Sequence, residues 1–250
     1  MLEAREISVV TNGVNRLTEM TVSLQAGELT ALIGPNGAGK TTLLECLAGS
    51  LLPATGQVLL DGKLLSEWAA LELARKRAVL PQNSTLNFPF SVLEVVLMGR
   101  TPYWLGQKET TFDLKIAVQA MEATDCLHLQ HQYFTRLSGG EQQRVQLARV
   151  LAQVWISRQD SPAYLLLDEP VSALDLAHQF SLMKFLKEFA RQGAGVCIVM
   201  HNLNLVKHYA DSLWVVSGGQ LVENGAIDTC LNADLIQQVF RVSAEAVMVP

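Results

Sequence analysis

Apolar and polar residues alternate over short stretches at the start of the chain, a pattern that is typical of β-strands. Residues 6–10 and 20–24 alternate loosely, and the turn-forming sequence Thr11-Asn12-Gly13 separates them. Residues 29–33 form a continuous apolar run with the length of a short buried strand, and residues 56–62 predict a further strand that ends in a turn. We therefore predict short antiparallel strands at the N-terminus, followed by a buried strand.

The middle of the chain changes to helical periodicity. A helix is predicted at about residues 40–48, and residues 91–155 lack strand alternation and carry several helical stripes. The clearest stripe consists of Leu147, Ala148, Leu151, Val154 and Trp155. Residues 155–162 have the composition of a surface loop inserted just before the next apolar segment.

Strands return in the last third of the chain. Residues 164–167 and 195–200 are apolar, and a helix is predicted between them near residues 177–191. Strand, helix and strand in this order indicate a parallel sheet with right-handed crossovers, and therefore an α/β architecture. Residues 213–217 and 220–223 predict a closing hairpin.

The composition is that of a globular domain. Of the 250 residues, 49% are apolar and 17% are charged, which excludes a disordered chain or a fibre. The net charge is −5 and no basic run is longer than Arg75-Lys76-Arg77, so we expect no nucleic-acid partner. The apolar runs are far shorter than the ~20 residues that a membrane-spanning helix needs. The acidic N-terminus is unlike a signal peptide, and the four widely spaced cysteines are typical of reduced thiols, so we expect a cytosolic protein.

A glycine-rich segment between the buried strand and the first helix matches the phosphate-binding loop G-x-x-x-x-G-K-[ST]. Its residues are Gly34, Pro35, Asn36, Gly37, Ala38, Gly39, Lys40 and Thr41, and Thr42 follows. Such a loop points successive backbone N–H groups at a phosphate, and the positive end of the following helix faces the same charge. Lys40 is placed to contact the β- and γ-phosphates, and the Thr41 hydroxyl is placed to bind Mg²⁺. The segment therefore predicts nucleotide binding.

Two adjacent acids follow the strand at residues 164–167. Asp168 at the strand end would lie beside the phosphate loop, where it can hold the Mg²⁺ shell. Glu169 follows directly and is placed to orient and deprotonate an attacking water molecule. An acid pair after a strand is also common in ordinary surface turns, and the upstream phosphate loop favours the catalytic interpretation.

The segment Leu137-Ser138-Gly139-Gly140-Glu141-Gln142-Gln143-Arg144 predicts a helix start, with Ser138 as the N-cap and Glu141 completing a capping box. The same string resembles the signature of ATP-binding cassette (ABC) proteins, and it stands between the phosphate loop and the acid pair, as in that family. Gln82 resembles the family's Q-loop glutamine, Ser172-Ala173-Leu174-Asp175 its D-loop, and His201 its switch histidine. The resemblance covers essentially the whole chain.

This resemblance implies an ABC-type nucleotide-binding domain over residues 1–250. It has a phosphate-loop core with a parallel sheet, an N-terminal antiparallel β-subdomain and an inserted helical subdomain at about residues 83–152. ATP and Mg²⁺ are the implied cofactors. The catalytic residues would be Glu169, His201 and Gln82, and the metal would be held by Thr41, Gln82 and Asp168.

The family resemblance also implies a homodimer that sandwiches two ATP molecules head to tail. Residues 37–42 of one chain and Ser138, Gly139 and Gly140 of the other would hold each ATP, with Asp175 close to the nucleotide. Hydrolysis removes the γ-phosphate contact that joins the two chains, and the opening of the dimer is the mechanical output.

Among cassette proteins, the chain is most similar to the ATPase subunits of bacterial importers for iron chelates, haem and cobalamin. It holds one cassette, no membrane domain, no long C-terminal regulatory domain and no space for a coiled-coil insertion. Residues 88–100 resemble the haem and iron-chelate group. Residues 174–179, together with the extra loop at residues 155–162, resemble the hemin-import group most closely. The implied partners are a polytopic permease dimer and, indirectly, a periplasmic substrate-binding protein, with the chain at the cytoplasmic face of the inner membrane. A cobalamin or ferric-siderophore importer, or a soluble cassette with a regulatory role, are the alternatives.

Two groups of residues are candidates for contacts with haem or with a permease. His128, His131 and Tyr133 lie close together in sequence, but in a polar stretch, so we interpret them as solvent-facing side chains at helix ends rather than haem ligands. Residues 88–100 resemble the family's docking surface for the permease. Their apolar members, Val92, Val95 and Val96, are equally consistent with a helical core.

One feature departs from the family pattern. Cassettes usually carry an aromatic residue some 25 to 30 positions before the lysine of the phosphate loop, and its ring stacks on the adenine. This chain has no Phe, Tyr or Trp before Trp68, and residues 7–12 offer only aliphatic or polar side chains. Either the base lacks a stacking partner, a gap that tyrosine at Val10 or Val9 would fill, or the Arg16 guanidinium takes this place.

Overall fold

The computed structural model describes residues 1–82, 86–104, 106, 108–155 and 162–243. The strands in chain order are β1 (Leu2–Thr11), β2 (Val14–Leu24), β3 (Leu29–Ile33), β4 (Thr55–Leu60), β5 (Lys63–Leu64), β6 (Arg77–Leu80), β7 (Tyr164–Asp168), β8 (Gly195–Val199), β9 (Ser212–Ser217) and β10 (Gln220–Ala226). The helices are α1 (Lys40–Ala48), α2 (Ala70–Lys76), α3 (Val92–Leu97), α4 (Thr111–Ala123), α5 (Gly139–Val154), α6 (Leu176–Arg191), α7 (Leu203–Tyr209), α8 (Ile227–Cys230) and α9 (Ala233–Phe240).

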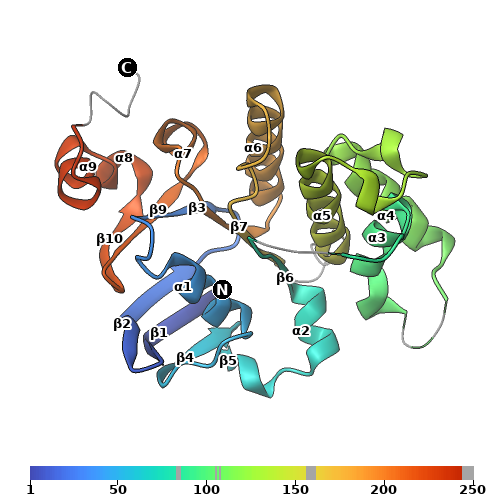
Figure 1. Ribbon diagram of the computed structural model, residues 1–250. Helices are drawn as coiled ribbons and strands as arrows, with labels where there is room; N and C mark the ends of the chain where they lie inside the picture. The colour runs from blue at the N-terminus through green and yellow to red at the C-terminus, as the bar shows by residue number, and fades with distance from the viewer. Residues whose placement is uncertain (83–85, 105, 107, 156–161, 244–250) are drawn as a thin grey trace.

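Two sheets organise the molecule (Figure 1). The N-terminal sheet is antiparallel, with the order β2-β1-β4-β5. The second sheet has the order β10-β9-β3-β8-β7-β6, in which the strands from β9 to β6 run parallel and β10 closes a hairpin with β9. The predicted α/β architecture, with a parallel sheet and an antiparallel N-terminal part, is confirmed.

Each inner strand of the parallel sheet places side chains in the cores on both faces of the sheet. In β7, Leu166 belongs to a core with α1 and the N-terminal sheet, whereas Leu165 and Leu167 belong to a core with α5 and α6. This two-sided burial is why β3, β7 and β8 are continuously apolar in the sequence. The sheet therefore holds α1 on one face and α5 on the other.

Helices α3, α4 and α5 pack together beyond the β6 edge of the parallel sheet (Figure 1). Val92, Val95 and Val96 on α3 are fully buried among them, so these three residues belong to the helical core and not to an exposed docking surface. The helices formed by the described residues are too short or too polar to span a bilayer.

The first two strands are longer than the sequence pattern predicts. The alternation predicts strands at residues 6–10 and 20–24, whereas β1 and β2 span Leu2–Thr11 and Val14–Leu24. Their pairing register shifts at three places along β1. Because each bulge inserts an extra residue, it interrupts the alternation of apolar and polar side chains and hides the full length of the strands.

Candidate nucleotide-binding site

The phosphate loop connects β3 to α1, and glycine is required at two of its turns. Gly34 has φ +153°, and a Cβ atom there would lie 1.9 Å from the carbonyl oxygen of Val216. Gly39 has φ +106°, and a Cβ atom there would lie 2.8 Å from the carbonyl oxygen of Arg16. A side chain at either position would displace neighbouring backbone, so the loop keeps its shape only with glycine.

Lys40 lies inside this loop. Its Nζ atom donates hydrogen bonds to the carbonyl oxygens of Gly34 and Pro35, each at 2.9 Å, and the residue is 7% exposed. Burial lowers the pKa of Lys40, while the negative charges of Glu169 and Asp168 act in the opposite direction. The ammonium group is therefore partly desolvated and held by neutral carbonyls, which is an arrangement that an incoming phosphate can complete.

Thr41, in the first turn of α1, contacts Asp168 at the end of β7. The Thr41 hydroxyl donates a hydrogen bond of 2.8 Å to Oδ2 of Asp168, at the end of β7. The other carboxylate oxygen, Oδ1, is buried and has no hydrogen-bond partner among the described residues. Burial raises the pKa of Asp168, partly offset by the hydrogen bond from Thr41. A buried oxygen without a partner, next to a hydroxyl, is a donor set that fits Mg²⁺.

Glu169 and His201 are brought together by two adjacent parallel strands, β7 and β8. Asp168 pairs with Val199 in the ladder, so the residues that follow the two strands leave the sheet at the same edge. The Nε2 atom of His201 lies 2.8 Å from Oε1 of Glu169. Glu169 has φ +50°, a left-handed conformation that is uncommon for a residue with a side chain. This backbone turn directs the carboxylate to the histidine.

Sequence reasoning assigned no role to Gln143, which links the signature helix to the segment after β7. Its Nε2 atom donates to the carbonyl oxygen of Glu169 at 2.8 Å, and its Oε1 atom accepts from the backbone N–H of Ala173 at 3.1 Å. Gly140 lies against the same segment, because a Cβ atom there would lie 2.9 Å from the Ala173 carbonyl oxygen. The only sequence signal for this role was the position of Gln143 one turn into a helix that begins at the signature.

The capping of α5 agrees with the prediction. The backbone N–H of Ser138 donates to the Glu141 carboxylate at 2.8 Å, and the Ser138 side chain accepts from the backbone N–H of Glu141. Asp175 caps α6 in a similar way, since its carboxylate accepts from the backbone N–H of His178 at 2.9 Å. This hydrogen bond and one to the His178 ring lower the pKa of Asp175. Both helix starts are exposed at the surface.

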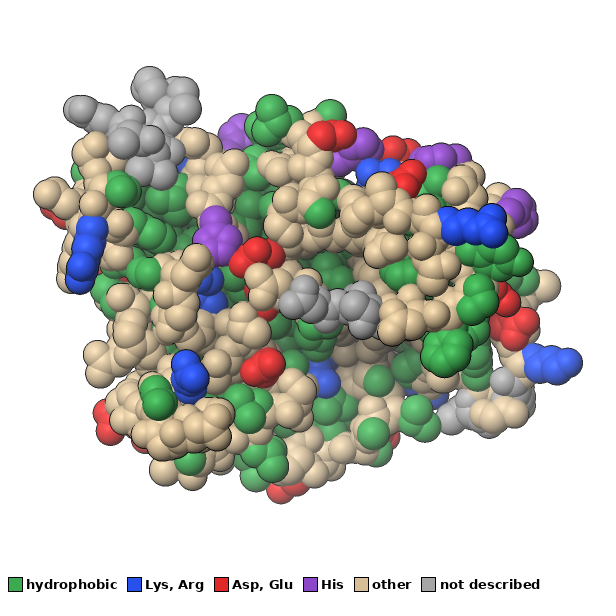
Figure 2. Space-filling view, viewed as in Figure 1, with side chains coloured by type: hydrophobic (Ala, Val, Ile, Leu, Met, Phe, Trp, Pro, Cys, Tyr) green, Lys and Arg blue, Asp and Glu red, His purple; other side chains and the backbone are tan. Residues whose placement is uncertain are grey.

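One cavity collects most of the predicted residues. It has a volume of about 630 Å³ and is lined by Arg16, Asn36, Gly37, Ala38, Gly39, Lys40, Thr41, Thr42, Gln82, Glu169 and His201. In the space-filling view, histidine, acidic and basic side chains meet around a hollow in the middle of this face (Figure 2). Ser138, Gly139, Gly140 and Asp175 do not line this cavity. Gly34, Pro35 and Asp168 are not among its lining residues either.

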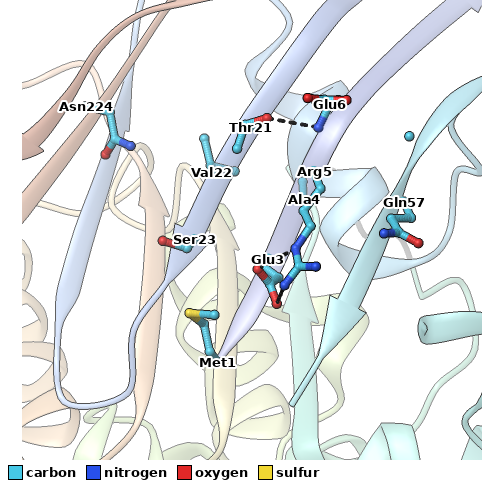
Figure 3. A pocket seen from close by; sticks show the side chains of 11 residues that line it. Met1, Glu3, Ala4, Arg5, Glu6, Thr21, Val22, Ser23, Gln57 and Asn224 are labelled. Carbon is cyan, nitrogen blue, oxygen red and sulfur yellow. Dashed lines mark hydrogen bonds and ion pairs between the residues drawn. The ribbon is translucent and has the colours of Figure 1, made fainter. Parts of the chain in front are cut away.

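A second cavity, of about 750 Å³, lies on the outer face of the antiparallel sheet (Figure 3). Its charged residues largely satisfy one another, because Arg5 donates two hydrogen bonds of 2.9 Å to the Glu3 carboxylate. The backbone N–H of Glu6 donates to the Thr21 hydroxyl at 2.9 Å. None of the residues predicted to bind ATP or Mg²⁺ lines this second cavity. Its larger volume therefore does not identify it as the nucleotide-binding site.

The residues considered for contacts beyond the nucleotide are on the surface. His128, His131 and Tyr133 are exposed in the segment between α4 and α5, which confirms their interpretation as solvent-facing side chains. No group of three metal-binding side chains occurs within the described ranges. Phe88 is 67% exposed and its ring lies 6.2 Å from that of Phe90, so part of residues 88–100 is an exposed aromatic surface. The loop predicted at residues 155–162 falls mostly outside the described residues.

Comparison with known protein families identifies one match. The ABC transporter family matches residues 17–172, which is more than half of the chain. Curated relatives include "Hemin import ATP-binding protein HmuV" of Gloeobacter violaceus, which is 50% identical over 96% of this chain and 87% of its own length. The protein of the same name from Myxococcus xanthus is 45% identical over 100% of this chain and 93% of its own length.

Solved structures with a similar fold include a metal-chelate type ABC transporter in an inward-facing conformation. It is 27% identical to this chain, with a TM-score of 0.80 over 97% of this chain and 89% of that one. The dimeric bacterial cassette MJ0796 is 24% identical, with a TM-score of 0.78 over 91% of this chain and 99% of that one. At 24% identity, the similarity to MJ0796 concerns the fold alone.

Proposed function

Because the chain belongs to the ABC transporter family, we propose that it is the ATP-hydrolysing subunit of a bacterial importer that takes up haem through a partner permease. Its membership of this family shows that the chain binds and hydrolyses ATP. The observation that supports haem as the cargo is the near full-length similarity, at 50% and 45% identity, to two proteins named as hemin import ATP-binding proteins. The cassette itself seldom touches the cargo, so the assignment depends on this likeness.

In the proposed mechanism, the phosphate loop and Lys40 bind the triphosphate. The backbone N–H groups of residues 37–42 and the positive end of α1 face the negative charge, and the Lys40 ammonium exchanges its two carbonyl partners for phosphate oxygens. The Gly34 and Gly39 contacts keep the loop in place before ATP arrives. Preorganised donors of this kind stabilise the charge that moves during phosphoryl transfer.

Thr41, Asp168 and Gln82 would hold Mg²⁺. When bound, Mg²⁺ neutralises the charge that develops on the phosphate oxygens during transfer. The support for this set is the partnerless Oδ1 atom of Asp168, its contact with the Thr41 hydroxyl and the position of Gln82 on the same cavity.

Glu169 is the proposed general base, and His201 positions it. The carboxylate lies at the cavity wall, and its 2.8 Å contact with His201 restricts its orientation. With a proton on its Nε2 atom, the His201 ring donates to the carboxylate and leaves the second carboxylate oxygen free to accept a proton from water. Gln143 adds a backbone anchor at the Glu169 carbonyl.

The signature residues Ser138, Gly139 and Gly140, together with Asp175, are proposed to act on the ATP bound by a second copy of the chain. Their absence from the lining of this chain's own cavity and the exposure of both helix starts support that arrangement. The backbone N–H groups at the start of α5 would face the γ-phosphate across a head-to-tail dimer. The cassette MJ0796, which has a similar fold, was solved as a dimer.

We also propose that residues 83–152 form the inserted helical subdomain and that Gln82 and residues 88–100 couple the ATP site to a polytopic permease dimer. The exposed rings of Phe88 and Phe90 follow Gln82 closely in sequence, which supports this contact. A periplasmic substrate-binding protein would take part only indirectly. The chain would then act as a peripheral protein at the cytoplasmic face of the inner membrane.

The test is growth of the host on haem as its sole iron source. We expect deletion of the gene to abolish this growth and to leave cobalamin uptake and siderophore-dependent growth intact. Wild-type complementation restores growth, and complementation with Glu169→Gln does not. Loss of cobalamin or siderophore uptake with intact growth on haem would favour the corresponding alternative importer. Purification without any polytopic membrane protein would favour the soluble regulatory role.

A further inference from the structure

The described residues that line the nucleotide cavity include no aromatic side chain. A base bound next to the phosphate loop therefore has no ring from these residues to stack on, although stacking on a planar group is a common way of holding a base. The two valines in the matching stretch do not supply a surface either. Val9 is 2% exposed and Val10 is 52% exposed, and neither lines the cavity.

Arg16 reaches this cavity through an irregularity in the β1–β2 hairpin. Val9 pairs with Leu17 whereas Val10 pairs with Asn15, so Arg16 is the extra residue on β2. A bulge leaves its extra residue out of the ladder and redirects the side chain. The bulge therefore explains why Arg16, a residue of the β1–β2 hairpin, lines the cavity beside the phosphate loop.

The backbone of Arg16 is fixed against that loop by two glycines. A Cβ atom at Gly39 would lie 2.8 Å from the Arg16 carbonyl oxygen, and one at Gly219 would lie 2.7 Å from it. Gly219 also accepts a hydrogen bond from the backbone N–H of Thr18 at 2.9 Å and donates one to the Ala38 carbonyl at 3.0 Å. Three segments thus pack backbone to backbone and hold the backbone of Arg16 beside the phosphate loop.

Arg16 is exposed, and the described residues provide its guanidinium with neither a hydrogen bond nor an ion pair. Its planar, weakly hydrated group is suited to stacking on a flat π-system.

We propose that Arg16 stacks its guanidinium on the base of the bound nucleotide and so replaces the missing aromatic residue. The inference rests on the proposed function of this cavity as the ATP site. It makes Arg16 a base-contacting residue, whereas Lys40 contacts phosphate.

The experiment compares ATP with inorganic tripolyphosphate, which offers the phosphates without a base, by calorimetric titration in the presence of Mg²⁺. For Arg16→Ala we expect ATP binding to weaken about three- to tenfold and tripolyphosphate binding to stay unchanged. Arg16→Lys, which keeps the charge but loses the plane, is expected to lose as much as the alanine variant. Arg16→Tyr is expected to retain ATP affinity. Arg191→Ala, an exposed arginine in the last turn of α6, is the matched control and is expected to bind both ligands as the wild type does.

Equal weakening of ATP and tripolyphosphate in Arg16→Ala would overturn the proposal and make Arg16 a phosphate contact. Full ATP affinity in both the alanine and the lysine variants would also overturn it. Failure of the proposed function is distinguishable from either outcome, because the wild type would then bind neither ligand. Melting temperatures equal to that of the wild type verify that the variants are folded.

Discussion

The Thr41 hydroxyl donates a hydrogen bond of 2.8 Å to Oδ2 of Asp168, although the two residues are 127 positions apart in the chain. The contact joins the first turn of α1 to the end of β7 and leaves Oδ1 of Asp168 buried without a partner among the described residues. This contact joins the phosphate loop directly to the acid pair.

Asp168→Asn is expected to reduce the affinity for ATP in Mg²⁺ by at least about tenfold and to change the affinity in EDTA little. The substitution keeps the shape of the side chain and removes the charge that a divalent cation requires. Calorimetric titration of ATP with and without Mg²⁺ measures the difference. An equal loss in EDTA would show that Asp168 supports the fold of the loop and not the metal.

The raised pKa of Asp168 predicts a pH dependence of stability. Burial makes the folded protein hold this proton above the pH of about 4 at which the unfolded chain releases it. The stabilisation is therefore fully present below the unfolded pKa and is lost as the pH rises through the folded pKa. Thermal unfolding in EDTA is expected to show a loss of stability for the wild type, relative to Asp168→Asn, as the pH increases from about 4. Parallel curves for the two proteins would contradict the raised pKa.

Glu169→Gln is expected to bind ATP but hydrolyse it about 10²- to 10⁴-fold more slowly, because the proposed base is lost while the phosphate contacts persist. The variant is also expected to accumulate as an ATP-dependent dimer on a sizing column. Lys40→Ala provides the contrast, since it is expected to weaken ATP binding itself. Wild-type turnover in Glu169→Gln would mean that another group is the base.

His201→Ala is expected to impair hydrolysis and largely keep ATP binding. Since His201 acts by positioning Glu169 across 2.8 Å, the double variant His201→Ala, Glu169→Gln is expected to be no slower than Glu169→Gln alone. Steady-state ATPase rates of the four proteins test this coupling. If the double variant loses rate by the product of the two single losses, His201 acts independently of Glu169.

Gln143→Leu is expected to lower the hydrolysis rate more than the ATP affinity, because it removes both anchors between α5 and the segment that follows β7. Gln142→Leu is the neighbouring control; this residue instead donates to the carbonyls of Phe134 and Leu137. Equal effects of the two substitutions on the rate would indicate a general loss of the helix start.

The sequence by itself determined the parts of the molecule that depend on local rules. The apolar runs of β3, β7 and β8 identified the parallel sheet, because strands buried on both faces must be continuously apolar. Helix α1 begins at Lys40 and ends at Ala48, as the pattern predicts. Gln82, Glu169 and His201, which the motifs single out, line one cavity with the phosphate loop.

Only the tertiary structure decided the relationships that depend on contacts between distant segments. The sequence pattern does not predict the short edge strand β6 or helices α2, α7, α8 and α9. Strand β6 and helix α8 have only four residues each, which is too few for a periodic signal. The anchoring of Glu169 and Ala173 by Gln143 joins segments that no local pattern connects. The position of Arg16 follows from a bulge whose location is set by the pairing of β1 with β2 and by backbone contacts at Gly39 and Gly219. Pairing register and close backbone approach are properties of the packed chain, so local sequence rules do not determine them.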